Sequence, residues 1–261
     1  MPVNSAAYPP LHYRLYAVWY RHFRVYTRNL LSNGLPPFLE PLIFLAGIGL
    51  GMSRYVDEMA GIPYLLFLAT GLPISTAMFT AAFECSFGTF IRLEFDHVYD
   101  GMLAAPIALS DLLIGEIIWA GTKGLFFSSA VIFIMSLFGQ APMPASLLSP
   151  VIGFFTGIMF GSMSLLVTSF VKTINHFNFY FTGFISPMFF FSGVVFPLEN
   201  LPTSLRYAAE VFPLTHSVRM ARGFVFGRVG PTIWIDIAYI ALFTTLCAFL
   251  AIRRLGKRLI V

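Results

Sequence analysis

Charged side chains are scarce in this sequence: they make up 11% of its 261 residues, whereas hydrophobic residues make up 57%. So little polar surface cannot coat a water-soluble globule, and the mean hydropathy of +0.80 agrees. The composition therefore excludes a soluble enzyme or binding domain and indicates an integral membrane protein. Since a helix needs about 20 residues to cross the hydrocarbon core, most of the chain is taken up by spans and no separate catalytic domain is expected.

Catalytic and metal-binding motifs are also missing. The chain has two cysteines, Cys85 and Cys247, and both lie in apolar runs, which favours small buried hydrophobic side chains over a disulfide or a metal site. HExxH, CxxC and GxSxG do not occur. Residues 115–123 are in the wrong order for the phosphate loop GxxxxGK[ST] and fall inside an apolar stretch. We therefore expect a chain that holds no metal and does not hydrolyse ATP itself.

The apolar stretches predict an all-α membrane protein with six spans. The expected spans are residues 36–52, 62–90, 111–138, 147–171, 176–196 and 232–252. An even number puts both termini on one side. Lys and Arg are more frequent on the side of the termini, which favours a multi-pass protein with cytoplasmic N- and C-termini. The net charge of +4 lies mostly at the chain ends and in one loop, so lipid headgroups are expected as its partner rather than nucleic acid.

Residues 10–30 predict an amphipathic helix in the membrane interface. Four arginines fall within about 80° of one another on a helical wheel, apart from the aromatic residues. They are Arg14, Arg21, Arg24 and Arg28. Such a helix lets arginines reach lipid phosphates while aromatic side chains enter the acyl region. The alternative is an ordinary basic flank that orients the first span.

The connection between the second and third spans, residues 92–106, is short and rich in ionisable side chains. Charge at the bilayer centre costs about 2.5–3.5 kcal/mol per residue, so this connection must face water. It is therefore a candidate contact for a soluble partner. Asp96 and Asp100 also form a DxxxD pair that could hold Mg²⁺ and a diphosphate, as in an intramembrane prenyltransferase. That function needs a second acidic cluster, and the other cytoplasmic connection offers only Lys172 and His176.

Three charged residues lie within expected spans: Glu84, Glu116 and Lys123. Glu84 and Lys123 belong to spans that leave the same connection, so they are expected at similar depth. We predict that they pair, which would relieve two buried charges at once. Separate snorkelling to the headgroups is an equal alternative. A proton relay is less favoured because the acidic residues form no continuous ladder across the membrane.

Other local patterns concern packing and the outer segment. Residues 198–210 and 213–226 predict two short helices that re-enter the outer leaflet, where Pro213 suits a first helical turn. Gly153, Gly157 and Gly161 recur every fourth position on the fourth span and favour close packing within one subunit over a dimer seam. The fifth span is crowded with phenylalanine, which could line a path for an amphiphile or face lipid.

The order of these parts resembles that of the permease subunit of type-2 ABC exporters, over nearly the whole chain. The runs that carry the resemblance are Glu40–Leu42, Phe83–Phe90, Ala104–Asp111, Gly115–Glu116, Pro187–Leu198 and Pro213–His216. They are most similar to the nodulation protein J type of lipo-oligosaccharide exporter. The resemblance implies one transmembrane domain over residues 1–261: an interfacial helix (10–30), six spans (36–252) and a basic cytoplasmic tail (253–261).

The resemblance also implies partners. Two copies of the permease would pair, and two ABC ATPase subunits would dock beneath them, carrying the ATP and Mg²⁺ that this chain does not bind. A coupling helix at Arg92–Ala104 would fit a groove on each ATPase. Its expected anchors are Phe95, Tyr99, Met102 and Leu103, with Arg92, Glu94, Asp96 and Asp100 as charged neighbours.

In this family the first and fifth spans face the transport path, which would put Phe177, Phe181, Phe184, Phe189 and Phe190 beside the cargo. The implied function is ATP-driven export of an amphiphile across the bacterial inner membrane. Lipo-oligosaccharide, another glycolipid and a hydrophobic drug all remain open as cargo. The alternatives are the prenyltransferase-like enzyme at Asp96 and Asp100 and a channel that needs no nucleotide.

Overall fold

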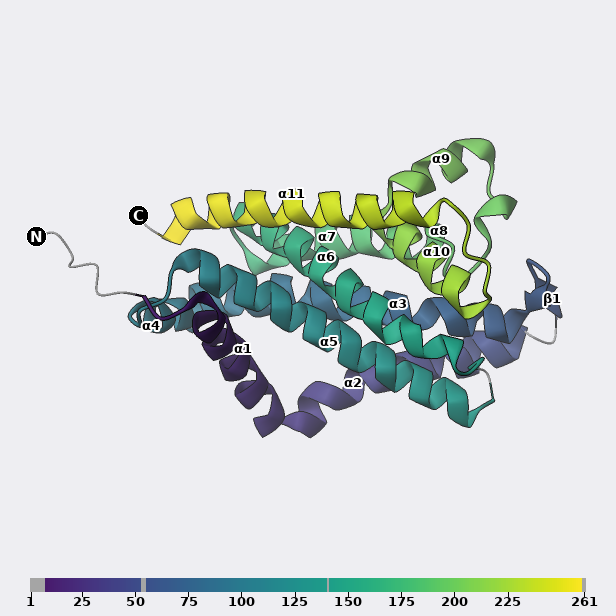
Figure 1. Ribbon diagram of the computed structural model, residues 1–261, viewed down its shortest axis with the longest axis horizontal. Coiled ribbons are helices and arrows are strands. Elements are labelled where there is room, and N and C mark those ends of the chain that lie inside the picture. Colours follow the sequence, from purple (N-terminus) through teal and green to yellow (C-terminus); the bar gives the residue numbers. More distant parts are fainter. Residues whose placement is uncertain (1–7, 53–54, 140, 260–261) are drawn as a thin grey trace, which may run out of the picture.

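A computed structural model describes residues 8–52, 55–139 and 141–259 of the chain. It is an elongated bundle in which the long helices α3, α5, α6 and α11 run along the long axis (Figure 1). The α-helices are α1 (Leu11–Arg28), α2 (Leu30–Phe44), α3 (Tyr64–Phe83), α4 (Val98–Leu103), α5 (Leu109–Leu137), α6 (Ser149–Phe170), α7 (Phe177–Tyr180), α8 (Ser186–Phe191), α9 (Thr203–Val211), α10 (Pro213–Val225) and α11 (Ile233–Leu259).

Shorter segments extend or join these helices. The π-helical turns are η1 (Leu45–Leu50), η2 (Glu84–Gly88), η3 (Ile91–Phe95) and η6 (Phe181–Ile185). The 3₁₀ turns are η4 (Ala145–Leu148), η5 (Ile174–His176) and η7 (Leu198–Asn200). A two-stranded antiparallel hairpin, β1 (Glu58–Met59) and β2 (Ile62–Pro63), follows the first helical run. Apart from this hairpin of two residues per strand, the regular elements of the described residues are helical, which agrees with the expected all-α membrane protein.

Four helical runs of the described residues are long and apolar enough to cross a membrane: Tyr64–Phe95, Leu109–Leu137, Ala145–Phe170 and Ile233–Arg258. They coincide with the expected second, third, fourth and sixth spans. The chain is thus a multi-pass membrane protein. The expected first span coincides with α2 and η1, and the expected fifth with α7, η6 and α8, but these two runs are not among the four.

Glycines on α6 determine how closely it packs on α5. A Cβ added at Gly153 would lie 2.1 Å from Ser128 Oγ, and one at Gly157 would lie 2.7 Å from the carbonyl oxygen of Ala120. Only glycine permits this approach of two helix backbones. The prediction that the glycine stripe packs within one subunit is confirmed. Apolar side chains of α3, α5, α6 and α8 complete the buried core around it.

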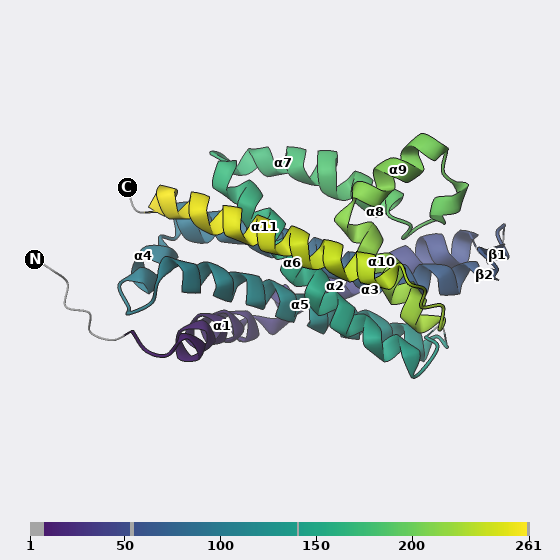
Figure 2. The same ribbon diagram turned by 45° about the horizontal axis from the view of Figure 1, so that its top comes forward.

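The outer segment folds as two short helices, as expected, although α9 begins five residues later than the predicted range 198–210. Pro213 occupies the first turn of α10, where the missing N–H costs no hydrogen bond. The hairpin, α9 and α10 lie at one end of the bundle, and α4 and the C-terminal end of α11 lie at the other (Figure 1). A turned view puts α7 and α1 on opposite sides of α11 (Figure 2).

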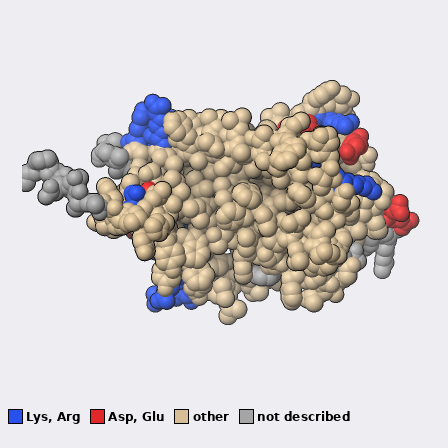
Figure 3. All heavy atoms as spheres, in the orientation of Figure 1, with Lys and Arg blue, Asp and Glu red and all other residues tan. Residues whose placement is uncertain are grey.

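Charged side chains gather toward these two ends on the visible face and leave a broad uncharged band between them (Figure 3). A band of this kind suits the hydrocarbon layer, and the charged ends suit the headgroups. The described part of the basic tail is helical, because α11 continues through residues 253–259. Its Arg258 Nη1 donates to the carbonyl oxygen of Val171 at 2.8 Å and Nη2 to Glu94 Oε1 at 2.8 Å, which ties the tail to the bundle.

Candidate functional site

The connection between α3 and α5 breaks into two pieces rather than forming the expected continuous helix over 92–104. His97 adopts a left-handed conformation (φ 49°) between η3 and α4, and this residue resets the direction of the helix. Phe95 is 61% exposed, and Asp96 and Asp100 are exposed beside it. We call the exposed side chains of Phe95, Asp96, His97 and Asp100 the coupling surface.

Three of the four expected anchors are wrong in part or in full. Tyr99 is 1% exposed and points into the bundle, so it offers nothing to a docking partner. Met102 and Leu103 are partly buried and pack against the core. Arg92 is also turned inward, and Glu94 pairs with Arg258. The break at His97 explains the difference, because it changes which side chains of α4 share a face with those of η3.

Beneath the coupling surface lies a cluster of buried charges. Arg92 Nη1 donates to Glu84 Oε1 and Arg92 Nη2 to Glu116 Oε2, both at 2.7 Å. Lys123 Nζ donates to Glu84 Oε2 at 2.8 Å, which confirms the predicted pair. Glu116 is fully buried. Two carboxylates and two cations thus neutralise one another, and the residues that sequence reasoning treated singly form one group.

Tyr99 and His22 attach this cluster to α4 and to α1. The Tyr99 hydroxyl donates to Glu116 Oε1 at 2.8 Å, and His22 Nε2 lies 3.0 Å from the same oxygen. Burial, followed by the charge of Glu116, raises the pKa of Tyr99 well above its ordinary value. The phenol therefore stays protonated and keeps its hydrogen bond. We call Glu84, Arg92, Tyr99, Glu116, Lys123 and His22 the inner network.

Helix α1 packs on α5 and does not lie free in the interface. Val18 fits against Gly115, where an added Cβ would lie 2.4 Å from Val18 Cγ1. Trp19 Nε1 donates to Thr122 Oγ1 at 2.9 Å, and His22 stacks on Trp119 with 5.9 Å between ring centroids. These contacts orient α1 so that its His22 reaches the inner network.

The four arginines of α1 accordingly divide into two pairs. Arg14 forms an ion pair with Asp111 at the start of α5, and Arg21 is half-buried. Desolvation by burial lowers the pKa of Arg21. Arg24 and Arg28 are exposed. Contact with lipid phosphates therefore remains a proposal for Arg24 and Arg28 alone, while Arg14 serves to attach α1 to α5.

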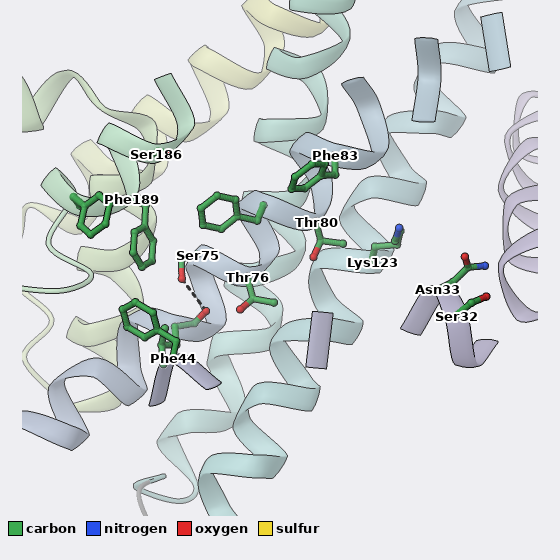
Figure 4. Close-up of a pocket in the computed structure, with 13 residues that line it drawn as sticks. Ser32, Asn33, Phe44, Ser75, Thr76, Thr80, Phe83, Lys123, Ser186 and Phe189 are labelled. Atoms are coloured by element: carbon green, nitrogen blue, oxygen red, sulfur yellow. Dashed lines mark hydrogen bonds between the residues drawn. The ribbon is translucent and has the colours of Figure 1, made fainter. Parts of the chain in front are cut away.

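A cavity of about 550 Å³ opens between α2, α3, α5 and α8. Figure 4 shows Phe44 and Phe189 gathered at one end of it and Lys123, Asn33 and Ser32 at the other. The hydroxyl groups of Ser75, Thr76 and Thr80 on α3 lie between the two ends. We call this space the amphipathic cavity, since one end is aromatic and the other is polar and cationic.

Two of the five phenylalanines expected beside the cargo line the amphipathic cavity. Phe189 and Phe190 line the cavity, together with Phe44, Phe79 and Phe83, which the sequence reasoning did not select. The expectation that Phe177 lies beside the cargo was wrong, because its side chain is fully buried in the core against Phe87 and Phe90. Phe181 stacks on Phe83 with 4.2 Å between centroids, and Phe184 is 63% exposed without lining the cavity.

Asp96 and Asp100 belong to no group of three or more potential metal ligands among the described residues. Asp100 lies 3.4 Å from His97, and both side chains are exposed. A group that could ligate a metal is instead His22, Glu84 and Glu116, whose ligand atoms lie within 4.8 Å of one another. Their carboxylates already accept hydrogen bonds from Arg92 and Lys123, so a metal would have to compete with two cations.

The sequence analysis did not predict a second polar group. It lies at the end of the bundle that carries the hairpin, α9 and α10, which we call the outer end. Arg219 on α10 donates to both oxygens of Glu210 and of Asp236, and His216 Nδ1 lies 2.7 Å from Asp236 Oδ1. Hydrogen bonding to Asp236 raises the pKa of Arg219. Asp236 is 1% exposed at the start of α11. The sequence feature that could have indicated this polar group is an acidic residue at the outer end of the last span, opposite a loop that is unusually rich in basic residues.

These features define a class. The multi-pass bundle and the charged connection between α3 and α5 fit a transport subunit, and the family model of the ABC-2 type transporter matches residues 13–226. The chain belongs to the ABC-2 type transporter family, whose members are membrane subunits of transporters and not themselves enzymes. An ABC ATPase is therefore its partner.

Individual relatives are similar to this chain over nearly its whole length. Nodulation protein J of Sinorhizobium fredii is 32% identical over 257 residues, 98% of each chain. Nodulation protein J of Rhizobium meliloti is 29% identical over 97% of each chain. The inner membrane transport permease YadH of Escherichia coli is 22% identical over 94% of this chain and 96% of its own. The resemblance seen in the sequence is thus confirmed, and the prenyltransferase alternative is not supported.

Proposed function

We propose that the chain is the permease of an ATP-driven exporter that moves an amphiphile out across the bacterial inner membrane. The observation that carries the proposal is a continuous line of polar contacts from α4, the helix that carries Asp100 of the coupling surface, to the amphipathic cavity. Tyr99 joins Glu116, Arg92 joins Glu116 to Glu84, and Glu84 joins Lys123, which lines the cavity. Movement of α4 would therefore reach the cavity through rigid, paired groups.

The lining of the cavity supports an amphiphilic cargo. Its aromatic end, at Phe44 and Phe189, suits an acyl chain or another apolar body. Its polar end, at Lys123 and Asn33, offers donors to a sugar or an acidic group. A lipo-oligosaccharide, another glycolipid or a hydrophobic drug meets this description.

Six spans, a homodimer and cytoplasmic termini belong to the same proposal. The helical runs α2 with η1 and α7 with α8 would complete the six, and both border the amphipathic cavity. A Cβ added at Gly47 or Gly51 would meet nothing within 4 Å, which leaves room for a second copy against the first span. The end that carries α4, the start of α1 and the basic end of α11 would then face the cytoplasm.

The coupling surface would meet the ATPase, which would hold the ATP and Mg²⁺. Phe95 would enter an apolar pocket of the partner, and Asp96 and Asp100 would meet basic residues at its rim. Two permeases and two ATPase subunits would form the working exporter.

The test is to purify the chain with its ATPase, reconstitute the complex in lipid and measure ATP turnover with a lipo-oligosaccharide and a glycolipid. We expect at least one amphiphile to raise turnover, and Phe189→Ala to reduce that stimulation. Phe155→Ala is the matched control, because Phe155 is 53% exposed on α6 and does not line the cavity. Turnover indifferent to every amphiphile, or equal losses in both variants, would contradict the proposal.

A further inference from the structure

A second cavity, of about 300 Å³, lies at the outer end of the bundle. It is enclosed by the start of α3, the segment between α8 and η7, and α10. We call it the outer cavity. The amphipathic cavity and the inner network share no residue with it, so the proposed transport mechanism leaves its lining unexplained.

Arg222 of α10 lines the outer cavity and has no carboxylate partner within residues 8–52, 55–139 and 141–259. Its Nε donates to Thr70 Oγ1 and its Nη2 to the carbonyl oxygens of Phe67 and Val194, each at 3.2 Å. The guanidinium carbon lies 3.6 Å from the centroid of the Phe67 ring. These neutral contacts fix the orientation of the guanidinium but do not neutralise its charge.

The remaining nitrogen of Arg222 is directed toward the lining of the cavity. Nη1 lies 3.6 Å from the position that a Cβ on Gly193 would occupy, and Gly193 itself lines the cavity. Gly193 has a φ of +83°, a conformation that side-chain-bearing residues rarely adopt. Gly193 therefore puts no side chain of its own over Nη1, and the neighbouring side chain at this point is that of Leu198, whose Cγ lies 3.3 Å from the same position.

Ser192 provides an independent observation in the same cavity. Its side chain is buried, with the residue 1% exposed, and Oγ has no hydrogen-bond partner in the described structure. A buried hydroxyl without a partner costs about 1–3 kcal/mol. A ligand that accepts from both Ser192 Oγ and Arg222 Nη1 would satisfy the hydroxyl and neutralise the buried charge together.

The other charged groups of the lining leave a positive surplus. Arg219 is already paired with Glu210 and Asp236, and Arg228 is exposed without an ion pair among the described residues. Glu199, which is exposed, is the one acid among the lining residues that the structure describes.

We propose that the outer cavity binds an oxyanion, a phosphate or sulfate group carried by an amphiphile. Arg222 and Ser192 hold the oxyanion inside the cavity, and Arg228 approaches it from the mouth. Phe67, Leu198, Val218 and Phe226 give the same cavity apolar walls, which favours an anion attached to a hydrophobic body over a free inorganic one.

The experiment measures binding to the purified full-length chain in detergent, by its thermal unfolding midpoint. The chain is titrated with dioleoylphosphatidylglycerol, with dioleoylglycerol, which has the same acyl chains but no phosphate, and with inorganic phosphate or sulfate. We expect phosphatidylglycerol to raise the midpoint more than dioleoylglycerol does. Arg228→Gln and Ser192→Ala should each raise the half-saturating concentration of phosphatidylglycerol, Arg228→Gln by about tenfold, the loss expected for one charge-assisted hydrogen bond.

Arg206→Gln is the matched control, because Arg206 is exposed on α9 at the same end of the bundle and does not line the cavity. Its half-saturating concentration should stay at the wild-type value. Arg222→Gln is tested as well, and if it does not fold, Arg228→Gln and Ser192→Ala carry the test.

A response to phosphatidylglycerol alone supports the lipid-borne oxyanion. A midpoint shift by inorganic phosphate or sulfate that Arg228→Gln weakens supports the oxyanion site and assigns it to a soluble anion. Equal responses to both lipids without any to the inorganic anions, or a wild-type response in Arg228→Gln and Ser192→Ala, would overturn the proposal. Because binding is read without ATP turnover, failure here is distinguishable from failure of the proposed export function.

Discussion

A buried arginine lies at each end of the bundle, and the two differ in how their charge is compensated. At the inner end Arg92 lies between two carboxylates, 2.7 Å from each, and the group is closed by Lys123 and Tyr99. At the outer end Arg222 has three neutral acceptors and forms no ion pair with the acids that the structure describes, although the exposed Glu199 attracts it from the same cavity. A closed group of paired charges resists solvation and suits the transmission of movement, whereas an uncompensated cation beside a cavity suits reversible binding.

The largest effect should follow from opening the inner network at its most buried acid. Glu116→Gln leaves Arg92 with one carboxylate and removes a charge that is fully enclosed. Removing one partner of a buried ion pair costs about 3–5 kcal/mol, so the yield of folded protein and the thermal midpoint should fall sharply.

Glu94→Gln is the control for this change. Glu94 also pairs with an arginine, Arg258, but its side chain is 39% exposed, and such a pair contributes about 0–1 kcal/mol. Equal midpoints for the two variants would show that the inner network does not stabilise the fold.

A smaller effect is expected at the outer end, where the paired group is partly exposed. Asp236→Asn removes the charge that Arg219 and His216 share, and a hydrogen bond to a charged group contributes about 1.5–3 kcal/mol. The thermal midpoint should drop less than in Glu116→Gln. Glu210→Gln, at the exposed side of Arg219, should cost less again, and the reverse order would contradict this view of the outer group.

Next in size is the loss of ATPase binding on removing the coupling surface. Phe95 is the large exposed apolar side chain of that surface, so Phe95→Ala should weaken association with the ATPase by about tenfold, measured by titration of the two purified subunits. Thermal stability should be unchanged because Phe95 is mostly exposed. Phe138→Ala, at another exposed phenylalanine directly after the end of α5, is the control and should keep full affinity.

Features that depend on the local sequence could be predicted, whereas features that depend on tertiary packing could not. Four of the six expected spans followed from composition, since long apolar runs have few alternatives to helices in a membrane. The ion pair of Glu84 and Lys123 could be predicted, because their two spans leave the same connection and put both residues at similar depth. The position of Arg92 between two acids could not be predicted, because it depends on how η3 turns against α5.

The face of α4 could not be predicted for a related reason. One left-handed residue, His97, rotates the following turn, and a helical wheel drawn through residue 97 puts Tyr99 on the wrong side. The phenylalanines of the fifth span show the same limit. Their number indicated an aromatic lining, but only the packing of α7 and α8 separates the buried Phe177 from Phe190, which lines the cavity.

The smallest change tests whether the inner network transmits movement or only holds the fold together. Tyr99→Phe removes one hydroxyl and its hydrogen bond to Glu116, which costs about 0.5–1.5 kcal/mol of stability and keeps the ring in place. ATPase binding should persist because Tyr99 is buried away from the coupling surface. The rise in ATP turnover on adding an amphiphile should nevertheless shrink, since α4 would no longer be hydrogen-bonded to the group that reaches Lys123.

Tyr207→Phe, at a 74% exposed position on α9, is the matched control. Wild-type stimulation in Tyr99→Phe would mean that the contact between α4 and Glu116 is structural and that coupling passes elsewhere.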